Sequence, residues 1–275
     1  MSGEIEARVA AHYGSAGLHE RIMERLAEAG ITPEVVTAEH LKAVDEFHIG
    51  GAEATAALLD QLEIGPGTRV LDVGSGIGGP ARMIVSRYGA KVTGIDLTPE
   101  FVETARRLTA AVGLEAEFVT GSALDLPFAA ESFDLATLLH VGMNLRDKPR
   151  LFAEVARVLV PGGTFAVYEV MLFGAHPAFP LPWADDAASS FVETPEAHLA
   201  AAEAAGFNLV SRRDRGEVAK AFFARMQAQM AGKAPPVVGL PLLLGPMAHA
   251  KVANMMAAVE AGGIQPVEMI FHKKG

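Results

Sequence analysis

The sequence contains no cysteine, which excludes disulfides, thiolate metal sites and a cysteine nucleophile. Basic residues are also few: 23 Lys and Arg against 33 Asp and Glu give a net charge of −10, which argues against a nucleic-acid-binding surface. The acidic N-terminus lacks the apolar core of a signal peptide, and the most apolar tract, residues 235–247, is short for a membrane span and contains prolines. These absences predict a cytoplasmic protein without nucleic-acid or membrane partners.

Alternating strand and helix patterns fill the middle of the chain. The strand patterns lie near 69–73, 91–95, 116–120, 133–139 and 163–170, and the clearest helices between them cover 99–112 and 148–159. Two further strands are expected at 207–212 and 265–272. Such alternation predicts an α/β fold with a parallel sheet and right-handed crossovers.

Helical patterns flank this region on both sides. Residues 1–62 are predicted to form an N-terminal helical cap, ahead of a core at 63–275. Within the core, residues 215–262 have helical patterns at both ends and a Pro/Gly-rich middle, and we interpret them as a helical lid inserted before the last strand. The methionines of this insertion either favour an apolar or aromatic ligand or fill the core: Met226, Met230, Met247, Met255 and Met256.

A glycine-rich turn follows the first strand pattern. Gly74, Gly76 and Gly79 end the run VLDVGSGIGG, and the next strand closes on Asp96, a carboxylate suited to a ribose diol. Taken alone, this pattern fits an NAD(P)-dependent oxidoreductase as well as other nucleoside-binding proteins. Asp72, where dinucleotide folds usually have an apolar residue, and the about 65 residues ahead of the strand favour another nucleoside.

Four segments carry a more specific signal: VLDVGSGIGGPAR, VTGIDLTPEFVETA, GSALDLPFAAESFD and RVLVPGGTF. In this order they resemble the class I S-adenosylmethionine-dependent methyltransferases, among them the ubiquinone/menaquinone, sarcosine/dimethylglycine and phosphoethanolamine groups. The resemblance implies a Rossmann-like seven-stranded sheet of order 3-2-1-4-5-7-6 with an antiparallel last strand. A tight hairpin usually joins the last two strands of that fold, whereas roughly fifty residues intervene here.

The resemblance also implies roles in binding S-adenosylmethionine. The assigned residues are Gly74, Ser75 and Gly76 for the methionine part, Asp72 for its amino group, Asp96 for the ribose, Leu97 and Ala123 for the adenine faces, Ser122 for its edge, and His48 and Tyr13 for closure. Relatives usually carry Asp at the position of Ser122, which can still accept a hydrogen bond but has no charge. The competing interpretations are an ordinary turn for the glycines, a surface or turn-capping role for the aspartates, and helix packing for His48 and Tyr13.

His140 is the main catalytic candidate, together with Tyr13. It follows the fourth strand, at the sheet edge where open α/β sheets bind ligands, and an imidazole titrates in the neutral range. Asn144 lies four residues later, where related enzymes place a second functional residue. Glu169 is a candidate for contacting a substrate cation or acting as a base, and Trp183 for lining the pocket; a core histidine, a solvent-facing acid and a loop anchor are the alternatives.

We therefore predict transfer of a methyl group from S-adenosylmethionine to a small-molecule acceptor by in-line displacement, with S-adenosylhomocysteine as product. The sequence leaves open whether the nucleophile is N, O or C; a phenol or carbon acid needs a general base, and a neutral amine does not. The alternatives are an NAD(P)-dependent oxidoreductase and a non-catalytic S-adenosylmethionine-binding protein. The nine histidines have no metal-ligand spacing, so no metal is expected, and a homodimer is left open.

Overall fold

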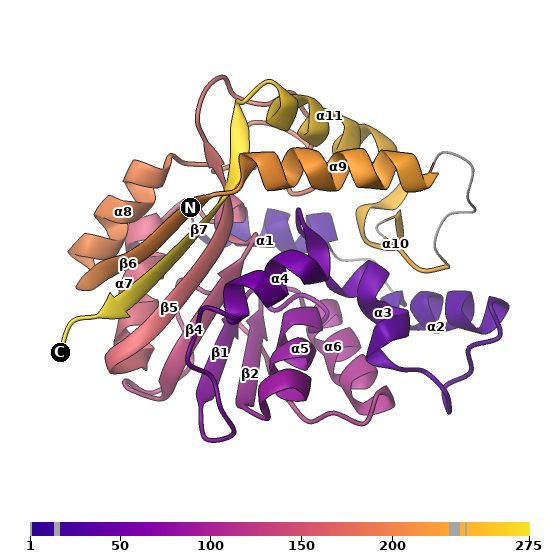
Figure 1. Ribbon diagram of the computed structural model, residues 1–275, viewed down its shortest axis with the longest axis horizontal. Coiled ribbons are helices and arrows are strands. Elements are labelled where there is room, and N and C mark those ends of the chain that lie inside the picture. Colours follow the sequence, from indigo (N-terminus) through magenta and orange to yellow (C-terminus); the bar gives the residue numbers. More distant parts are fainter. Residues whose placement is uncertain (1, 14–16, 231–236, 240) are drawn as a thin grey trace.

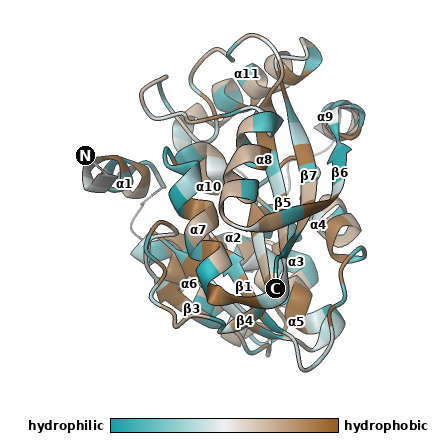
Figure 2. Ribbon diagram, turned by 90° about the vertical axis from the view of Figure 1, so that its left-hand side faces the viewer, coloured by the Kyte–Doolittle hydropathy of each residue, from teal (hydrophilic) through white to brown (hydrophobic). Residues whose placement is uncertain are grey.

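The computed structural model describes residues 2–13, 17–230, 237–239 and 241–275. Helices cover both faces of one seven-stranded sheet (Figures 1 and 2). The strands are β1 Arg69–Val73, β2 Lys91–Asp96, β3 Glu117–Thr120, β4 Phe133–Leu139, β5 Leu159–Leu172, β6 Phe207–Asp214 and β7 Ile264–Lys273. Their order is β3-β2-β1-β4-β5-β7-β6, as predicted.

Strands β1 to β5 pair in parallel, and β7 runs antiparallel between β5 and β6. The parallel strands are apolar because helices cover both of their faces; all but the first residue of β1 are buried. All five carboxyl ends therefore lie at one edge of the sheet, where ligands bind in open α/β folds. The expected antiparallel last strand is confirmed.

The two faces of β5 enter different apolar clusters. Phe165 and Val167 pack in the cluster that contains Phe152 of helix α7, whereas Ala166 and Tyr168 pack with Leu58 of helix α4. The other core helices alternate with the strands, and their bounds are α5 Gly79–Tyr88, α6 Pro99–Ala111, α7 Lys148–Val158 and α8 Pro195–Ala204. This alternation of side chains along β5 gives the sheet a packed core on each side.

Strand β5 begins earlier than predicted. It starts at Leu159 rather than at 163, and its pairing with β4 shifts register between Phe133 and Leu135. Gly162 has φ 76°, a left-handed conformation that lets the chain bulge without leaving the sheet. The Pro161–Gly163 run therefore forms an irregularity within the strand rather than the turn that precedes it.

The N-terminal segment is helical, as predicted, with shifted boundaries. Its helices are α1 Ser2–Tyr13, α2 Leu18–Glu28, α3 Ala38–Asp45 and α4 Gly51–Leu59. A helix is also expected at 34–44; helix α3 starts instead at Ala38, because Thr37 forms a capping box with His40. Whether residues 1–62 form a separate unit stays a prediction.

The segment between β6 and β7 is helical at both ends, as expected. It contains α9 Gly216–Met230, α10 Pro241–Leu244, the 3-10 turn Gly245–Met247 and α11 Ala248–Glu260. Three of the five methionines pack in an apolar cluster with Trp183, which agrees with the core interpretation: Met226, Met255 and Met256. Met247 is exposed, and the side chain of Met230 lies outside the described part of the chain. By length and composition alone, the run 241–260 also meets the criteria for a membrane-crossing helix.

Candidate functional site

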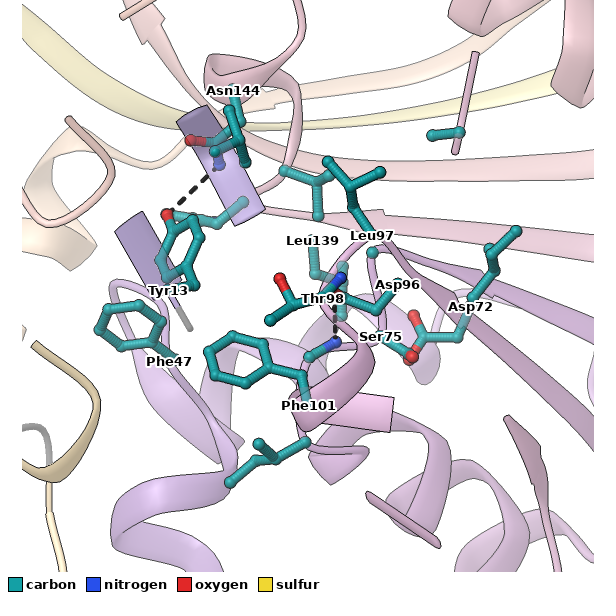
Figure 3. A pocket seen from close by; sticks show the side chains of 18 of the residues that line it. Tyr13, Phe47, Asp72, Ser75, Asp96, Leu97, Thr98, Phe101, Leu139 and Asn144 are labelled. Atoms are coloured by element: carbon teal, nitrogen blue, oxygen red, sulfur yellow. Dashed lines mark hydrogen bonds between the residues drawn. The ribbon is translucent and has the colours of Figure 1, made fainter. Parts of the chain in front are cut away.

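A cavity opens at the carboxyl ends of β1, β2 and β4, beneath helix α1 (Figure 3). Most of the predicted site residues line it: Tyr13, His48, Asp72, Gly74, Ser75, Gly76, Asp96, Leu97, Ser122, Ala123, His140 and Asn144. Glu169 and Trp183 do not. The topology thus brings side chains from distant parts of the chain into one site.

The glycines of the turn after β1 have different roles. Gly74 has φ 72°, and a Cβ there would lie 2.3 Å from the side chain of Val141. Gly76 has φ 53°, and a Cβ there would meet nothing within 4 Å. Gly74 is therefore required by packing and also lines the cavity, and Gly76 exposes its backbone to the cavity; their contact with the methionine part of a cofactor stays a prediction.

Asp96 is held by the backbone around it. Its Oδ2 accepts a hydrogen bond from the Gly76 N–H at 2.9 Å, and its Oδ1 accepts one from the Thr98 N–H at 2.9 Å. Burial raises the pKa of this carboxyl, and the backbone donors oppose that shift. Each oxygen keeps further lone-pair capacity, so the fixed carboxylate can accept bonds from two adjacent hydroxyls.

Asp72 and Ser75 leave polar atoms without partners in the cavity wall. Thr137 donates to Asp72 Oδ1 at 2.8 Å, but neither Asp72 Oδ2 nor the Ser75 hydroxyl has a hydrogen-bond partner among the described residues. Burial raises the pKa of Asp72 to about 7. An unsatisfied buried polar group costs about 1–3 kcal/mol, so these atoms fit a ligand that supplies hydrogen-bond donors, such as an ammonium group.

The residues assigned to adenine binding also line the cavity: Leu97, Ala123 and Ser122. The Ser122 hydroxyl donates to the carboxylate of Glu6 and accepts from the Leu124 N–H. Helix α1 thus places a carboxylate beside the position where relatives have an acid. No sequence pattern marks Glu6 for this place.

The ring of His140 has one engaged and one unpaired nitrogen. His140 has φ 54°, and its backbone N–H and its Nδ1 both bond the Tyr168 carbonyl, at 2.7 Å and 3.0 Å. The carbonyl can only accept, so Nδ1 carries the proton and Nε2 is the basic nitrogen. Nε2 is buried without a partner among the described residues, and burial lowers the pKa of His140 well below its ordinary value.

His48 lies against His140, with ring centroids 5.3 Å apart. Its Nε2 lies 2.9 Å from Glu46 Oε2 and 2.8 Å from Thr55 Oγ1, and its Nδ1 lies 3.3 Å from the Ile49 carbonyl. Both ring nitrogens thus lie within hydrogen-bond distance of oxygen atoms of the protein. The ring lines the cavity, and the role of His48 in closing the site stays a prediction.

Tyr13 and Asn144 form a polar pair across the cavity (Figure 3). The Asn144 amide donates to the Tyr13 hydroxyl at 3.4 Å, and Asn144 Oδ1 has no partner among the described residues. Burial raises the pKa of Tyr13 far above its ordinary value, so the phenol keeps its proton. Phe47 and Phe101, which sequence reasoning missed, pack against the Tyr13 ring at 6.4 Å and 5.7 Å between centroids.

Two predicted site residues, Glu169 and Trp183, do not line the cavity and instead hold other parts of the chain in place. Glu169 is buried behind the cavity and accepts hydrogen bonds from the Val141 and Gly142 N–H groups at 2.7 Å and 2.8 Å. Trp183 is buried in the apolar cluster beside α9 and α11, and its indole donates to Ser190. Glu169 therefore fixes the chain immediately after His140, and Trp183 is a loop anchor.

No group of three metal-ligating side chains occurs among the residues that the structure describes. The residues that line the cavity supply groups that can bind an organic ligand: a carboxylate fixed by backbone, unpaired acceptors and apolar walls. Those groups fit a nucleoside at one end and a second small molecule beside His140 at the other.

Residues 71–167 match a family model described as a methyltransferase domain. Methyltransferase GfsG of Streptomyces halstedii is 32% identical over 153 residues, 55% of this chain and 52% of the relative. Sterol 24-C-methyltransferase ERG6B of Gibberella zeae is 38% identical over 117 residues, 42% of this chain and 31% of the relative. The matched segments thus span about half or less of these relatives.

Solved structures share the fold over a longer stretch. A geranyl diphosphate methyltransferase in complex with GPP and sinefungin superposes with a TM-score of 0.71 at 17% identity, over 98% of this chain and 99% of that one. A putative sarcosine dimethylglycine methyltransferase from Galdieria sulphuraria gives 0.64 at 18%, covering 80% and 85%. The [4+2]-cyclase SpnF gives 0.65 at 22%, covering 93% of each chain. The predicted fold is thereby confirmed.

Proposed function

We propose that this chain, whose residues 71–167 match a methyltransferase-domain model, transfers a methyl group from S-adenosylmethionine to a small-molecule acceptor. The observation that supports this most is the combination of Asp96 with the Gly76 turn and the unpaired atoms of Asp72 and Ser75. A diol, a flexible chain and an ammonium group are the features that these residues can bind. The bound cofactor supplies the activated methyl group.

The residues of this chain contribute position and a proton acceptor. The Tyr168 carbonyl fixes the His140 tautomer, and Glu169 holds the turn that follows it. His140 Nε2 is thereby available to take a proton from the acceptor as its nucleophile reacts. Positioning of reactants can contribute about 7–11 kcal/mol, and a general base adds roughly 10²–10⁴-fold.

Helix α1 and the inserted helices support a lid over the reacting groups. Tyr13 of α1 and Leu243 of α10 both line the cavity. Arg8 pairs with Asp186 at 3.3 Å, His12 lies 3.2 Å from Asp185, and Lys251 of α11 lies 3.1 Å from the same carboxylate. These contacts support closure of the cavity against water. A cytoplasmic location, a homodimer and the absence of nucleic-acid and membrane partners stay predictions.

Calorimetry and turnover test the proposal separately. S-adenosylmethionine and S-adenosylhomocysteine are titrated into the purified chain, with NADH as the comparison ligand. Binding of both sulfur nucleosides and not NADH is expected; the reverse supports the oxidoreductase. Methyl transfer is then followed as formation of S-adenosylhomocysteine over a panel of small molecules.

A non-catalytic or non-methylating role is the second candidate, because the structural neighbours include a [4+2]-cyclase. Binding of S-adenosylmethionine without transfer to any acceptor that binds the cavity, together with unchanged cofactor after prolonged incubation, would favour that role. Transfer to one acceptor excludes it.

A further inference from the structure

The cavity around His140 offers no cation to an anionic molecule. None of the described residues that line it is Lys or Arg, the side chains that usually hold phosphates and carboxylates. Its carboxylates already have partners: Glu6 with Ser122, Asp45 with Arg82, Asp96 with two backbone N–H groups, and Asp72 with Thr137. The unpaired oxygen of Asp72 is the exception and belongs to the half beside Ser75.

His48 does not supply the missing charge. Its ring is paired with the buried Glu46 carboxylate, and Thr55 donates to the same carboxylate at 2.7 Å. The side chains of His48 and Glu46 are each 3% exposed. Both nitrogens of the His48 ring contact oxygen atoms of the protein, so neither is free to bind an anion beside His140.

The cavity is otherwise lined by apolar side chains. They include Val9, Phe47, Leu139, Val141, Leu145 and Leu243, which come from α1, the loop after α3, β4 and its following turn, and α10. Apolar walls from separate elements bind apolar surface without requiring one shape of ligand.

Three polar groups interrupt this apolar lining. His140 Nε2 and Asn144 Oδ1 are buried acceptors without partners among the described residues. The Tyr13 hydroxyl accepts from Asn144 and retains a proton to donate. A hydroxyl group can donate its proton to one of the two acceptors and accept a hydrogen bond from Tyr13; an alkene leaves both acceptors unpaired.

Resting on the proposed methyl transfer, we infer that the acceptor is an uncharged, largely apolar molecule that presents one acidic hydroxyl, a phenol or an enol, to His140. His140 Nε2 takes the hydroxyl proton while the oxygen forms its bond to the methyl carbon and the carbon–sulfur bond breaks, its electron pair staying on sulfur. The products are a methyl ether, a neutral thioether and an imidazolium, so charge and atoms balance. The lowered pKa of His140 suits a proton that becomes acidic during transfer and does not suit an ammonium proton.

Matched probes on fixed frames test this inference. The naphthalene series is 2-naphthol, 2-naphthoate, 2-naphthalenemethanamine and 2-vinylnaphthalene, and a second series carries the same four groups on the ring carbon opposite the chain of pentylbenzene, so that its hydroxyl member is also a phenol. Each is titrated by calorimetry into the full chain saturated with S-adenosylhomocysteine. We expect the hydroxyl probe to bind at least 10-fold more tightly than the charged probes and the alkene on at least one frame, and 2-naphthol to be methylated when S-adenosylmethionine replaces the product.

The outcomes separate this inference from the function on which it rests. Failure of S-adenosylhomocysteine to bind contradicts the proposed function. Cofactor binding with tighter binding of a carboxylate, amine or alkene probe, or with no hydroxyl probe bound on either frame, overturns the inference alone.

A charge placed in the lining gives a second, independent readout. Leu243→Lys adds an ammonium group to the cavity wall, and we expect it to increase binding of 2-naphthoate at least 10-fold while weakening binding of the amine. Leu242→Lys is the matched control, because Leu242 is also half-buried on α10 but does not line the cavity. Equal effects of both substitutions, or none, contradict a charge-free acceptor site.

Discussion

The two halves of the cavity are built in different ways. The half around Asp96 uses backbone N–H groups and glycine conformations within one β-α-β segment, so a short stretch of sequence determines its shape. The half around His140 combines side chains from α1, the loop after α3, and β4 with its following turn, which meet only in the folded chain. The first half is therefore specified locally, and the second by tertiary packing.

The largest expected effect belongs to the locally built half. Asp96→Ala removes the carboxylate that accepts from Gly76 and Thr98 and leaves no acceptor for a ribose diol. Loss of two charge-assisted hydrogen bonds predicts about 10³-fold weaker binding of S-adenosylhomocysteine by calorimetry. Asp125→Ala is the control, because the Asp125 side chain is 89% exposed. Undiminished binding in Asp96→Ala contradicts the cofactor assignment.

In the half around His140, a substitution should lower kcat rather than the affinity for the cofactor. His140→Asn keeps a residue type that tolerates φ 54° but removes the basic nitrogen. We expect kcat to fall roughly 10²–10⁴-fold and the Kd for S-adenosylmethionine to change less than threefold. The acidic limb of the pH–kcat profile should also disappear, since neutral His140 is the active form and its pKa is lowered by burial.

His198→Asn is the matched control for that substitution. His198 on α8 is also buried, its Nδ1 also contacts a backbone carbonyl, and its Nε2 is also without a partner among the described residues, but it does not line the cavity. The control separates loss of a buried histidine from loss of the base. Equal losses of kcat in both variants contradict the role of His140.

The pH dependence of the free energy of unfolding involves the buried carboxyl of Asp72, which lies beside Ser75. The folded pKa of Asp72, about 7, lies above its ordinary value of 3.8 because the group is buried. Its contribution to stability is therefore complete below pH 3.8 and is lost as pH rises through 7. Asp72→Asn should leave stability at pH 4 nearly unchanged and increase the free energy of unfolding at pH 8 by about 2–4 kcal/mol. Denaturant titration at both pH values checks this, and an equal change at both contradicts it.

The smallest effect is expected at the contacts that hold α1. Asp185→Asn weakens the pairs with His12 and Lys251, but the Asp185 side chain is 66% exposed, and such pairs contribute about 0–1 kcal/mol. The KM for S-adenosylmethionine should rise twofold to fivefold with kcat unchanged. Glu217→Gln, which weakens an exposed pair with Lys220 on α9, should leave KM unchanged. A larger effect of the control contradicts closure by α1.

The difference between the locally specified half and the half formed by tertiary packing also explains which features the sequence could predict. The strands and Asp96 were predictable because buried parallel strands and glycine turns leave a local pattern. Glu6 and Phe101 were missed because their roles arise when α1 lies across the sheet edge. Glu169 was misassigned because a carboxylate at a strand end has the same sequence signal whether it faces a ligand or backbone N–H groups.

The backbone of His140 also restricts how this position can evolve. Its φ of 54° is accessible to glycine and, among side-chain-bearing residues, chiefly to Asn, Asp and His. Substitution by a β-branched residue would strain a segment that Tyr168 and Glu169 hold in place. Substitutions at this position are therefore confined to a few residue types, most of them able to exchange a proton or donate a hydrogen bond. New methyl-acceptor substrates are consequently more readily acquired through changes in α1 and the inserted helices.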